Sequence, residues 1–426
     1  MYDYLIRNTL LKGNRVDIAI KGKKFVAIEP AGTLHSQASS KTIEGTRFLA
    51  RSPFYNAHTH QAMTLLRGID DECTLMDWLK RCIWPREIRL TPELVEIGTQ
   101  LAILEGIHSG CVAFNDMYFH QPATIRAAIK MGVRAQIGLV MMDQVSDHIE
   151  NETTLEMRAE LPETIHLAFA PHALYTTTPE ILRDVARQAE RLRLPIHMHA
   201  SESLAEVETA RTRFNKTPIA YLDSCGLLNE TTILAHACHL TDADIEILSQ
   251  RQCILAHCPQ SNQKLASGIF PYVRVTQAGL RMTVGTDGAA SNNGLSMISE
   301  SKAAALSAKC SSGAPETVKF ATLDRAVTEV AANALGFPHA GRITVGSDAD
   351  LLLVNMDRTF FAGGGDPDNN FIYASDSSCV DTVFCNGRLL MQASSVEGEA
   401  EILSAARKAS EVLRSTYASA NKKASS

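Results

Sequence analysis

The residues of this sequence best suited to chemistry are histidines and an aspartate, each of which follows an apolar run: His58, His60, His199, His236 and Asp287. His58 and His60 form a His-x-His pair, and residues two apart on a strand point to the same side. Imidazole nitrogens and a carboxylate oxygen, with one position left open to water, make a catalytic metal site. The pattern predicts one divalent metal ion, with zinc the first choice and iron or manganese as alternatives.

Glu202 follows His199 by three residues and places a carboxylate just past the same predicted strand. At that spacing it can reach the open side of a metal, take a proton from water and pass it to a leaving group. His197 points to the same side as His199 but one layer deeper, so we expect a histidine inside the fold, and an exchange of roles between the two stays open. His236 would either ligate the metal or orient the nucleophile by a hydrogen bond.

Several common catalytic motifs are absent from the sequence. It contains no HExxH, no GxSxG, no GxGxxG and no P-loop, which argues against those hydrolase classes and against a nucleotide cofactor. The segment His148-Ile149-Glu150 is similar to the His-x-Glu of the small zinc deaminases, but no Pro-Cys-x-x-Cys follows it. The stretch 168–173 holds no lysine that could bridge two metals, so a single metal is expected.

Composition and charge narrow the functional class. The 426 residues carry a net charge of -6 and a pI near 6.2, which argues against a nucleic-acid binder because such proteins usually present a basic face. The ten cysteines include no Cys-x-x-Cys pair, as is typical of buried thiols in a reduced, intracellular protein. No signal-peptide pattern and no membrane-length apolar run is found. We therefore expect a cytoplasmic enzyme with a small-molecule substrate, no nucleic-acid or membrane partner, and a homo-oligomeric state.

Apolar strands alternate with helical stretches through the middle of the chain. Helix starts are marked by threonine, proline and glutamate at residues 91–93 and 178–180. Strands are expected near 53–58, 112–116, 133–140, 166–171, 195–199, 231–236, 253–257 and 282–287. Near-continuous apolar strands separated by helices predict an α/β fold of the (β/α)8 barrel type. A doubly wound open sheet is the competing architecture, but metal-ligand residues end several different strands, as expected of a ring that converges on one mouth.

Short strands and turns dominate both ends of the chain. The Asn386-Gly387 pair, for example, predicts a hairpin. We expect residues 1–52 to form the first part of a small β-sandwich, 53–344 the metal-dependent (β/α)8 barrel, and 345–426 the second part of the sandwich with a helix over 399–416. The polar segment 146–162 is expected to be either a lid over the barrel mouth or a solvated insertion.

Five stretches carry a resemblance to a known family: NAHTHQAMTLLRG (56–68), DMYFH (116–120), PH (171–172), HCPQSN (257–262) and GTDGAASNN (285–293). With them the chain resembles the amidohydrolase superfamily over essentially its full length. Within that superfamily it resembles the aminohydrolase branch of cytosine, guanine and methylthioadenosine/S-adenosylhomocysteine deaminases and triazine hydrolases. The stretches are highly specific for the branch and moderately specific for the methylthioadenosine/S-adenosylhomocysteine deaminase group.

The resemblance implies a (β/α)8 barrel with a composite β-sandwich, and one metal held by His58, His60, His199 and Asp287. It implies that His236 orients the hydroxide, that Glu202 moves the proton, that Asp287 also accepts a proton, and that ammonia leaves a ring carbon. It further implies that Glu87 binds ribose hydroxyls and that His172 contacts the substrate. Without the resemblance, Glu87 would be interpreted as a helix-end carboxylate and His172 as a loop histidine.

One departure from the group concerns arginine. Members that accept nucleosides with charged tails use arginines shortly after the third strand, whereas this sequence has none between Arg134 and Arg158. The pocket there is expected to be apolar. This argues against S-adenosylhomocysteine, with its carboxylate tail, and leaves methylthioadenosine, adenosine, 5'-deoxyadenosine or a non-nucleoside aminoheterocycle.

The sequence thus predicts a metal-dependent hydrolase of carbon–nitrogen bonds that deaminates an aminopurine nucleoside or a related aminoheterocycle. One alternative is a triazine-type hydrolase that expels chloride or an amine, and another is a deaminase of a free base such as guanine, a pterin or cytosine. A barrel that has lost catalysis and serves as a scaffold is the alternative from a different class. Glu202 beside His236 favours a leaving group that needs a proton, and the unbroken ligand set argues against the scaffold.

Overall fold

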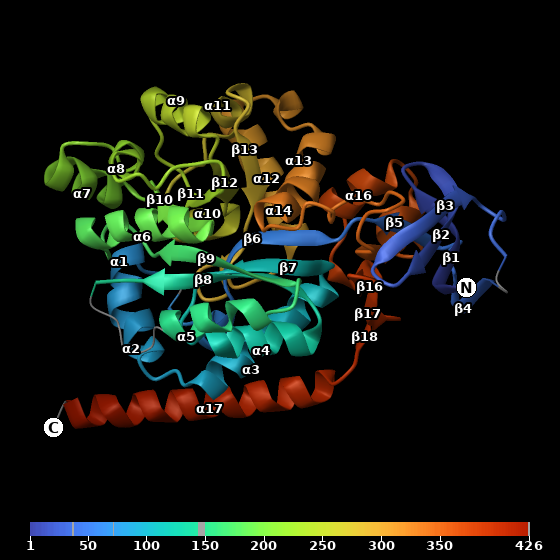
Figure 1. The fold of residues 1–426 in the computed structure, drawn as a ribbon, viewed down its shortest axis with the longest axis horizontal. Coiled ribbons are helices and arrows are strands. Elements are labelled where there is room, and N and C mark those ends of the chain that lie inside the picture. The colour runs from blue at the N-terminus through green and yellow to red at the C-terminus, as the bar shows by residue number, and fades with distance from the viewer. Residues whose placement is uncertain (36–37, 71, 144–149, 425–426) are drawn as a thin grey trace.

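The structure, a computed structural model, describes residues 1–35, 38–70, 72–143 and 150–424. Parallel strands and surrounding helices form the main body, and a smaller β region holds the N-terminus (Figure 1). The long helix α17 (Glu399–Ala424) packs along α3 (Pro92–His108). In the described part of the chain, no helix combines the length and the apolar character that a membrane span needs.

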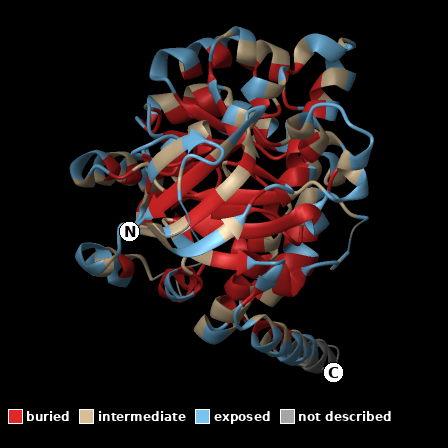
Figure 2. Cartoon of the chain, turned by 90° about the vertical axis from the view of Figure 1, so that its right-hand side faces the viewer, coloured by how far each residue is buried: buried red, intermediate tan, exposed pale blue. Residues whose placement is uncertain are grey.

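The larger sheet is parallel and follows the strand order β13-β12-β11-β10-β9-β8-β7-β6-β14. In chain order its strands are β6 (Phe54–His60), β7 (Cys111–Asp116), β8 (Arg134–Met141), β9 (Ile165–Pro171), β10 (Ile196–Ala200), β11 (Thr232–His236), β12 (Ile254–His257), β13 (Arg281–Val284) and β14 (Asp287–Gly288). Only Gly285 and Thr286 separate β13, which pairs with β12, from β14, which pairs with β6. The two ends of the sheet therefore meet, and this curled parallel sheet is consistent with the expected barrel. Figure 2 shows that its strands are buried.

The helices that cover the sheet begin where the sequence predicts. Thr91 accepts a hydrogen bond from the backbone of Leu94 at the start of α3, and Thr178 accepts one from Ile181 at the start of α6. Besides α3, the longer helices of the main body are α4 (Gln121–Met131), α6 (Pro179–Leu192), α7 (Leu204–Phe214), α8 (Pro218–Ser224), α9 (Asp242–Arg251), α12 (Met297–Ser312) and α13 (Phe320–Val327). Shorter helices are η2 (Gln61–Leu66), α1 (Leu75–Trp78), η3 (Leu79–Ile83), α2 (Trp84–Glu87), α5 (Asn151–Glu156), η4 (Met157–Glu160), α10 (Pro259–Lys264), α11 (Tyr272–Gln277), η5 (Pro315–Thr317) and α14 (Glu329–Ala334).

The second sheet combines strands from both ends of the chain. Its members are β1 (Tyr2–Leu11), β2 (Asn14–Lys21), β3 (Lys24–Pro30), β4 (Ser39–Glu44), β5 (Phe48–Arg51), β15 (Leu351–Asn355), β16 (Val380–Cys385), β17 (Arg388–Gln392) and β18 (Ser395–Val396). Antiparallel pairing of β5 with β15 joins the two groups. The Asn386-Gly387 turn connects β16 to β17, as predicted. The sequence did not indicate α15 (Thr359–Ala362), α16 (Pro367–Tyr373) or η6 (Ser377–Cys379), and the C-terminal helix extends beyond the expected 399–416.

A buried ionic network links the two sheets. Arg134, at the start of β8, donates from Nε to Asp350 Oδ2 and from Nη2 to Asp348 Oδ2, both at 2.9 Å. The Tyr55 hydroxyl donates to the same oxygen of Asp350 at 2.5 Å. Arg134 is thus held by carboxylates that lie far along the sequence.

The polar segment 146–162 is only partly described. Residues 146–149 lie outside the described residues, and α5 and η4 follow them. The expectation of a lid stays untested.

Candidate active site

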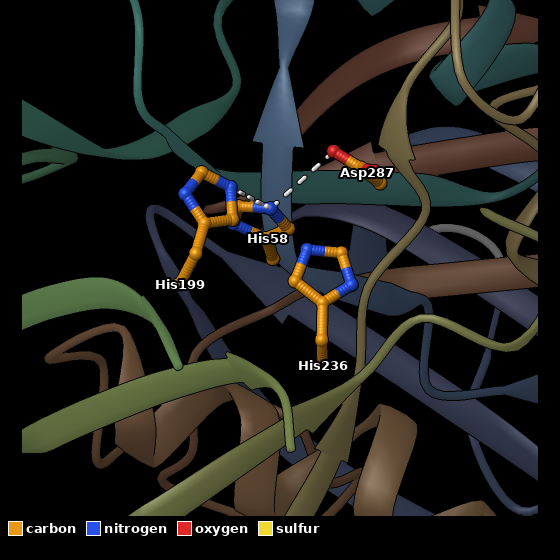
Figure 3. Close-up of side chains that lie close together, drawn as sticks. All are labelled: His58, His199, His236 and Asp287. Carbon is orange, nitrogen blue, oxygen red and sulfur yellow. Dashed lines mark hydrogen bonds and ion pairs between the residues drawn. The ribbon is translucent and has the colours of Figure 1, made fainter. Parts of the chain in front are cut away.

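The candidate metal-ligand residues His58, His199, His236 and Asp287 converge toward the carboxyl ends of β6, β10 and β11 and at β14 (Figure 3). His58, His199, His236 and Asp287 each offer one ligand atom, and these atoms all lie within 4.8 Å of one another. All four side chains are buried. Parallel strands bring their carboxyl ends to one mouth, and this is why residues far apart in sequence meet here.

His60 lies beside this group. Its Nε2 is 3.1 Å from Asp287 Oδ1 and 3.2 Å from His199 Nε2. The family resemblance implied His60 rather than His236 as a ligand, whereas the residues alone left His236 open as a ligand, and the group of four within 4.8 Å includes His236. His197 lies deeper in the fold, and its Nε2 is 2.8 Å from His58 Nδ1. This contact fixes the orientation of the His58 ring.

The proton on three of these imidazoles can be placed from its partner. In His60, His199 and His236, Nδ1 faces an oxygen atom at 2.6, 2.8 and 2.8 Å, respectively: the carbonyls of Met117 and His172 and the side-chain amide of Asn262. An oxygen acceptor requires the N–H at Nδ1, which leaves the lone pair on Nε2. The lone pairs of His60 and His199 therefore face each other at 3.2 Å beside a carboxylate. A cation between them relieves this repulsion, so the donor set fits one divalent metal ion of the zinc type.

Asp287 is held in a single orientation. Its Oδ2 accepts hydrogen bonds from Ser261 at 2.6 Å and from Ser291 at 2.8 Å, which leaves Oδ1 toward the histidines. Gly285 makes this position possible, because a Cβ there would lie 2.8 Å from the backbone nitrogen of His58.

Glu202 lies on the wall of the same cavity and is 4% exposed. Ser267 donates to its Oε1 at 3.1 Å. Burial raises the pKa of Glu202, and the nearby His236 opposes that rise. Glu206 fixes the turn, because its carboxylate oxygens accept from the backbone nitrogens of Ser201 at 3.0 Å and Glu202 at 2.8 Å.

The cavity extends from the histidines to Glu87 and Tyr118. Glu87 is 6% exposed, and burial raises the pKa of its carboxyl group to about 7. The hydroxyl of buried Tyr118 has no hydrogen-bond partner of good geometry among the described residues, although it is close enough for the Glu87 carboxylate to raise its pKa further. A buried carboxylate and a phenol in one cavity can form hydrogen bonds with the polar groups of a ligand or with water.

The remaining wall is largely apolar. Among the described residues that line the cavity there is no lysine or arginine, and the apolar members are Met63, Leu75, Trp78, Leu79, Trp84, Met117, Phe119, Val140, Met142 and Leu265. His172 also lines it, and its Nδ1 lies 2.9 Å from the Thr176 hydroxyl. The expected apolar pocket is present in the described part of the chain.

Several residues of the site were not identified from the sequence. Tyr118, Ser261, Asn262 and Ser291 lie in the stretches that carried the family resemblance, but nothing in their spacing indicated a role. Glu206 follows Glu202 at the four-residue spacing of a helix face, and this was the one local signal available.

Comparison with known proteins agrees with this geometry. The model of the amidohydrolase family matches residues 54–390. The chain belongs to the amidohydrolase family. Its enzymes are hydrolases, and this member carries the buried histidines and aspartate that fit a single divalent metal.

Relatives and solved structures cover nearly all of this amidohydrolase. A 5-methylthioadenosine/S-adenosylhomocysteine deaminase from Carboxydothermus hydrogenoformans is 39% identical over 382 residues, 88% of each chain. A 5'-deoxyadenosine deaminase from Methanothrix thermoacetophila is 38% identical and covers 96% of this chain and 97% of its own length. The crystal structure of an adenosine deaminase from Xanthomonas campestris with bound zinc superposes with a TM-score of 0.92 at 32% identity, covering 97% of this chain and 99% of that one.

Proposed function

We propose that this amidohydrolase hydrolytically deaminates an adenine nucleoside and releases ammonia. The observation that carries the proposal is a single buried cavity with the His and Asp cluster at one end and Glu87 with Tyr118 at the other. A nucleoside has matching ends, because the amino group of its base is lost and its sugar presents hydroxyls. The names of the Carboxydothermus, Methanothrix and Xanthomonas proteins support the same class of substrate.

The metal would be held by His58, His60, His199 and Asp287. When bound, an ion of this kind lowers the pKa of a water molecule to about 7 and thereby supplies the nucleophile. His197 stabilises the orientation of His58 through the 2.8 Å contact between their ring nitrogens. The hydrogen bonds from Ser261 and Ser291 to Asp287 support its assignment, because they leave one oxygen free for the ion.

Glu202 is proposed to carry the proton. Its carboxylate takes the proton from the attacking water and returns it to the substrate, so that the amino group leaves as neutral ammonia. The raised pKa of Glu202 supports this role, because a carboxylate whose pKa is raised accepts a proton from water more readily. His236, with its proton on Nδ1 toward Asn262, directs Nε2 at the nucleophile and accepts a hydrogen bond from it.

Glu87 and Tyr118 are proposed to bind the sugar hydroxyls, and His172 to contact the base. The apolar wall fits a 5'-methylthio, 5'-deoxy or 5'-hydroxymethyl group better than a charged tail, because a carboxylate would be buried there without a cation. We therefore propose that methylthioadenosine, 5'-deoxyadenosine and adenosine are better substrates than S-adenosylhomocysteine.

Ammonia release from purified, zinc-loaded protein tests the proposal. The panel contains adenosine, methylthioadenosine, 5'-deoxyadenosine, S-adenosylhomocysteine, guanine, cytosine, a pterin and a chlorotriazine, and the matched variant is Glu202→Gln. Release from adenine nucleosides, lost in the variant, is the expected result. Turnover of only a free base or a triazine would reject the nucleoside assignment, and no turnover with metal bound would reject the enzyme assignment for this panel.

The organisation of the chain remains part of the proposal. We propose that 1–52 and 345–426 form a β-sandwich and 53–344 a (β/α)8 barrel. A separate buried cluster that includes Ile6, Ile18, Phe48, Leu351 and Phe384 supports the β-sandwich.

We also propose a cytoplasmic location. All ten cysteines are free and eight of them are buried, which supports this proposal. A homo-oligomer is proposed as well, and light scattering would test it.

A further inference from the structure

A second group of metal-ligating side chains lies outside the His and Asp cluster. Asp70, Cys73 and Cys82 each offer one ligand atom, and the three atoms lie within 4.8 Å of one another. The Cys82 thiol donates to Asp70 Oδ2 at 3.5 Å. We propose that these residues bind a thiophilic divalent cation of the zinc class, separate from the catalytic ion and held by the segment that forms one wall of the substrate cavity.

The donor atoms define the class of cation. Two sulfurs and one carboxylate oxygen suit zinc and similar soft or borderline ions, whereas magnesium and calcium select all-oxygen sites. Ligand bonds of about 2.3 Å to sulfur and about 2.1 Å to oxygen put neighbouring donor atoms about 3.5 to 4 Å apart in a tetrahedral site. The present spacing therefore needs only a small contraction, and water would complete the coordination.

The surroundings compensate the charge of such a site. Two thiolates and a carboxylate carry one more negative charge than a divalent ion neutralises. Arg81 and Arg86 both act electrostatically on Cys82, and Arg81 also acts on Asp70. Arg86 Nη1 donates to the backbone carbonyl of Cys82 at 2.6 Å. This hydrogen bond keeps the positive guanidinium group beside the proposed site.

A disulfide is the alternative use of two neighbouring cysteines. It would involve Cys73 and Cys82 only and would give Asp70 no role. The Asp70 carboxylate lies within 4.8 Å of both sulfurs. The same carboxylate is a third ligand for a cation, so the geometry favours metal binding.

An ion at this position would act on the substrate cavity through one segment of chain. Asp70 and Cys73 precede α1, whereas Cys82 lies in η3. Between and just after them, Trp78, Leu79, Trp84 and Glu87 line the cavity. Binding would tie the start of the segment to its middle and fix the wall that these side chains form.

Cobalt substitution tests the site without an activity assay. The catalytic cluster contains no sulfur, so a thiolate-to-cobalt charge-transfer band in the near ultraviolet reports the second site alone. We expect this band in the full-length protein loaded with Co²⁺ and its loss on adding Zn²⁺. We also expect the band to disappear in Cys82→Ser and in Cys73→Ser. By elemental analysis, each variant should bind about one ion per chain fewer than the wild type. Cys310→Ser, which removes an exposed thiol of α12, is the matched control and should keep the band.

Three results would overturn the proposal. They are a wild-type protein without the band although its histidine cluster is loaded, a band that survives both substitutions, and peptide mapping that finds Cys73 joined to Cys82 in metal-loaded protein. Circular dichroism confirms that each variant is folded. If Cys82→Ser does not fold, the more exposed Cys73 provides the test, and its alkylation by iodoacetamide should slow about tenfold or more when zinc is added. The site does not depend on the deaminase assignment, so failure of either leaves the other standing.

Discussion

Replacing Glu87 by glutamine tests the sugar-binding end of the cavity without touching the metal cluster. Burial raises the pKa of the Glu87 carboxyl group from 4.5 to about 7. Between these values the folded protein binds more protons than the unfolded chain, so the contribution of this group to stability is lost as the pH rises through that window. At pH 8 the ionised carboxylate costs about 3 kcal/mol of folding free energy, and a glutamine at this position avoids that cost.

The expected result is therefore a variant that is more stable than the wild type in alkaline solution and less active. The advantage of Glu87→Gln in free energy of unfolding should grow by about 2 to 3 kcal/mol between pH 5 and pH 8. For a chain of 426 residues that unfolds as one unit, this corresponds to about 2 to 3 °C in Tm. The KM for a nucleoside should meanwhile rise about tenfold or more, because hydrogen bonds to a carboxylate are each worth about 1.5 to 3 kcal/mol.

Thermal unfolding at a series of pH values, with zinc in excess, measures the first effect. Glu156→Gln replaces an exposed glutamate and is the matched control, which should show no pH-dependent difference. A stability advantage of Glu87→Gln that does not grow from pH 5 to pH 8 would refute the reasoning, because it would mean that the folded protein accommodates the charge of Glu87 without cost.

Three further predictions address the chemistry, the sugar contact and the link between the sheets. Glu202→Gln should lower kcat by about 10² to 10⁴ with unchanged metal content by elemental analysis, and a kcat near that of the wild type would exclude Glu202 as the proton carrier. Tyr118→Phe should lower kcat/KM about 3- to 10-fold for adenosine but not for its 2',3'-dideoxy analogue, so equal losses for both substrates would contradict the hydroxyl contact. Arg134→Met should destabilise the protein by about 3 to 5 kcal/mol in chemical denaturation because Asp350 is left buried without a counter-charge, and a loss below about 1 kcal/mol would show that the network is not needed.

The positions of the candidate ligands could be predicted because they depend on local rules. Apolar runs mark buried strands, and parallel strands direct their carboxyl ends to one mouth, so the histidines and the aspartate at the strand ends were expected to meet there: His58, His60, His199, His236 and Asp287. The structure brings them together. Whether His60 or His236 joins the group of four could not be predicted, because the exact position of each ring depends on side-chain partners such as Asn262 rather than on spacing.

Contacts between segments that the sequence does not connect could not be predicted. Arg134 and Asp350 are 216 positions apart, and no periodicity links them. Tyr118, just after β7, and Glu87, in α2, line the same cavity, and Asp70, which precedes α1, contacts Cys82 in η3. The ten cysteines were interpreted as buried thiols, but Cys73 and Cys310 are not fully buried.

The sequence by itself therefore determined the chemical inventory, the order of strands and helices, and the end of the sheet at which the histidines gather. Side-chain direction repeats with a short period along a strand or helix, and this is a local property of the chain. The tertiary structure decided which imidazole nitrogens face the centre, which side chains complete the far end of the cavity, and which thiols lie within reach of a carboxylate. These outcomes depend on how distant elements pack against one another, and packing is a property of the whole fold.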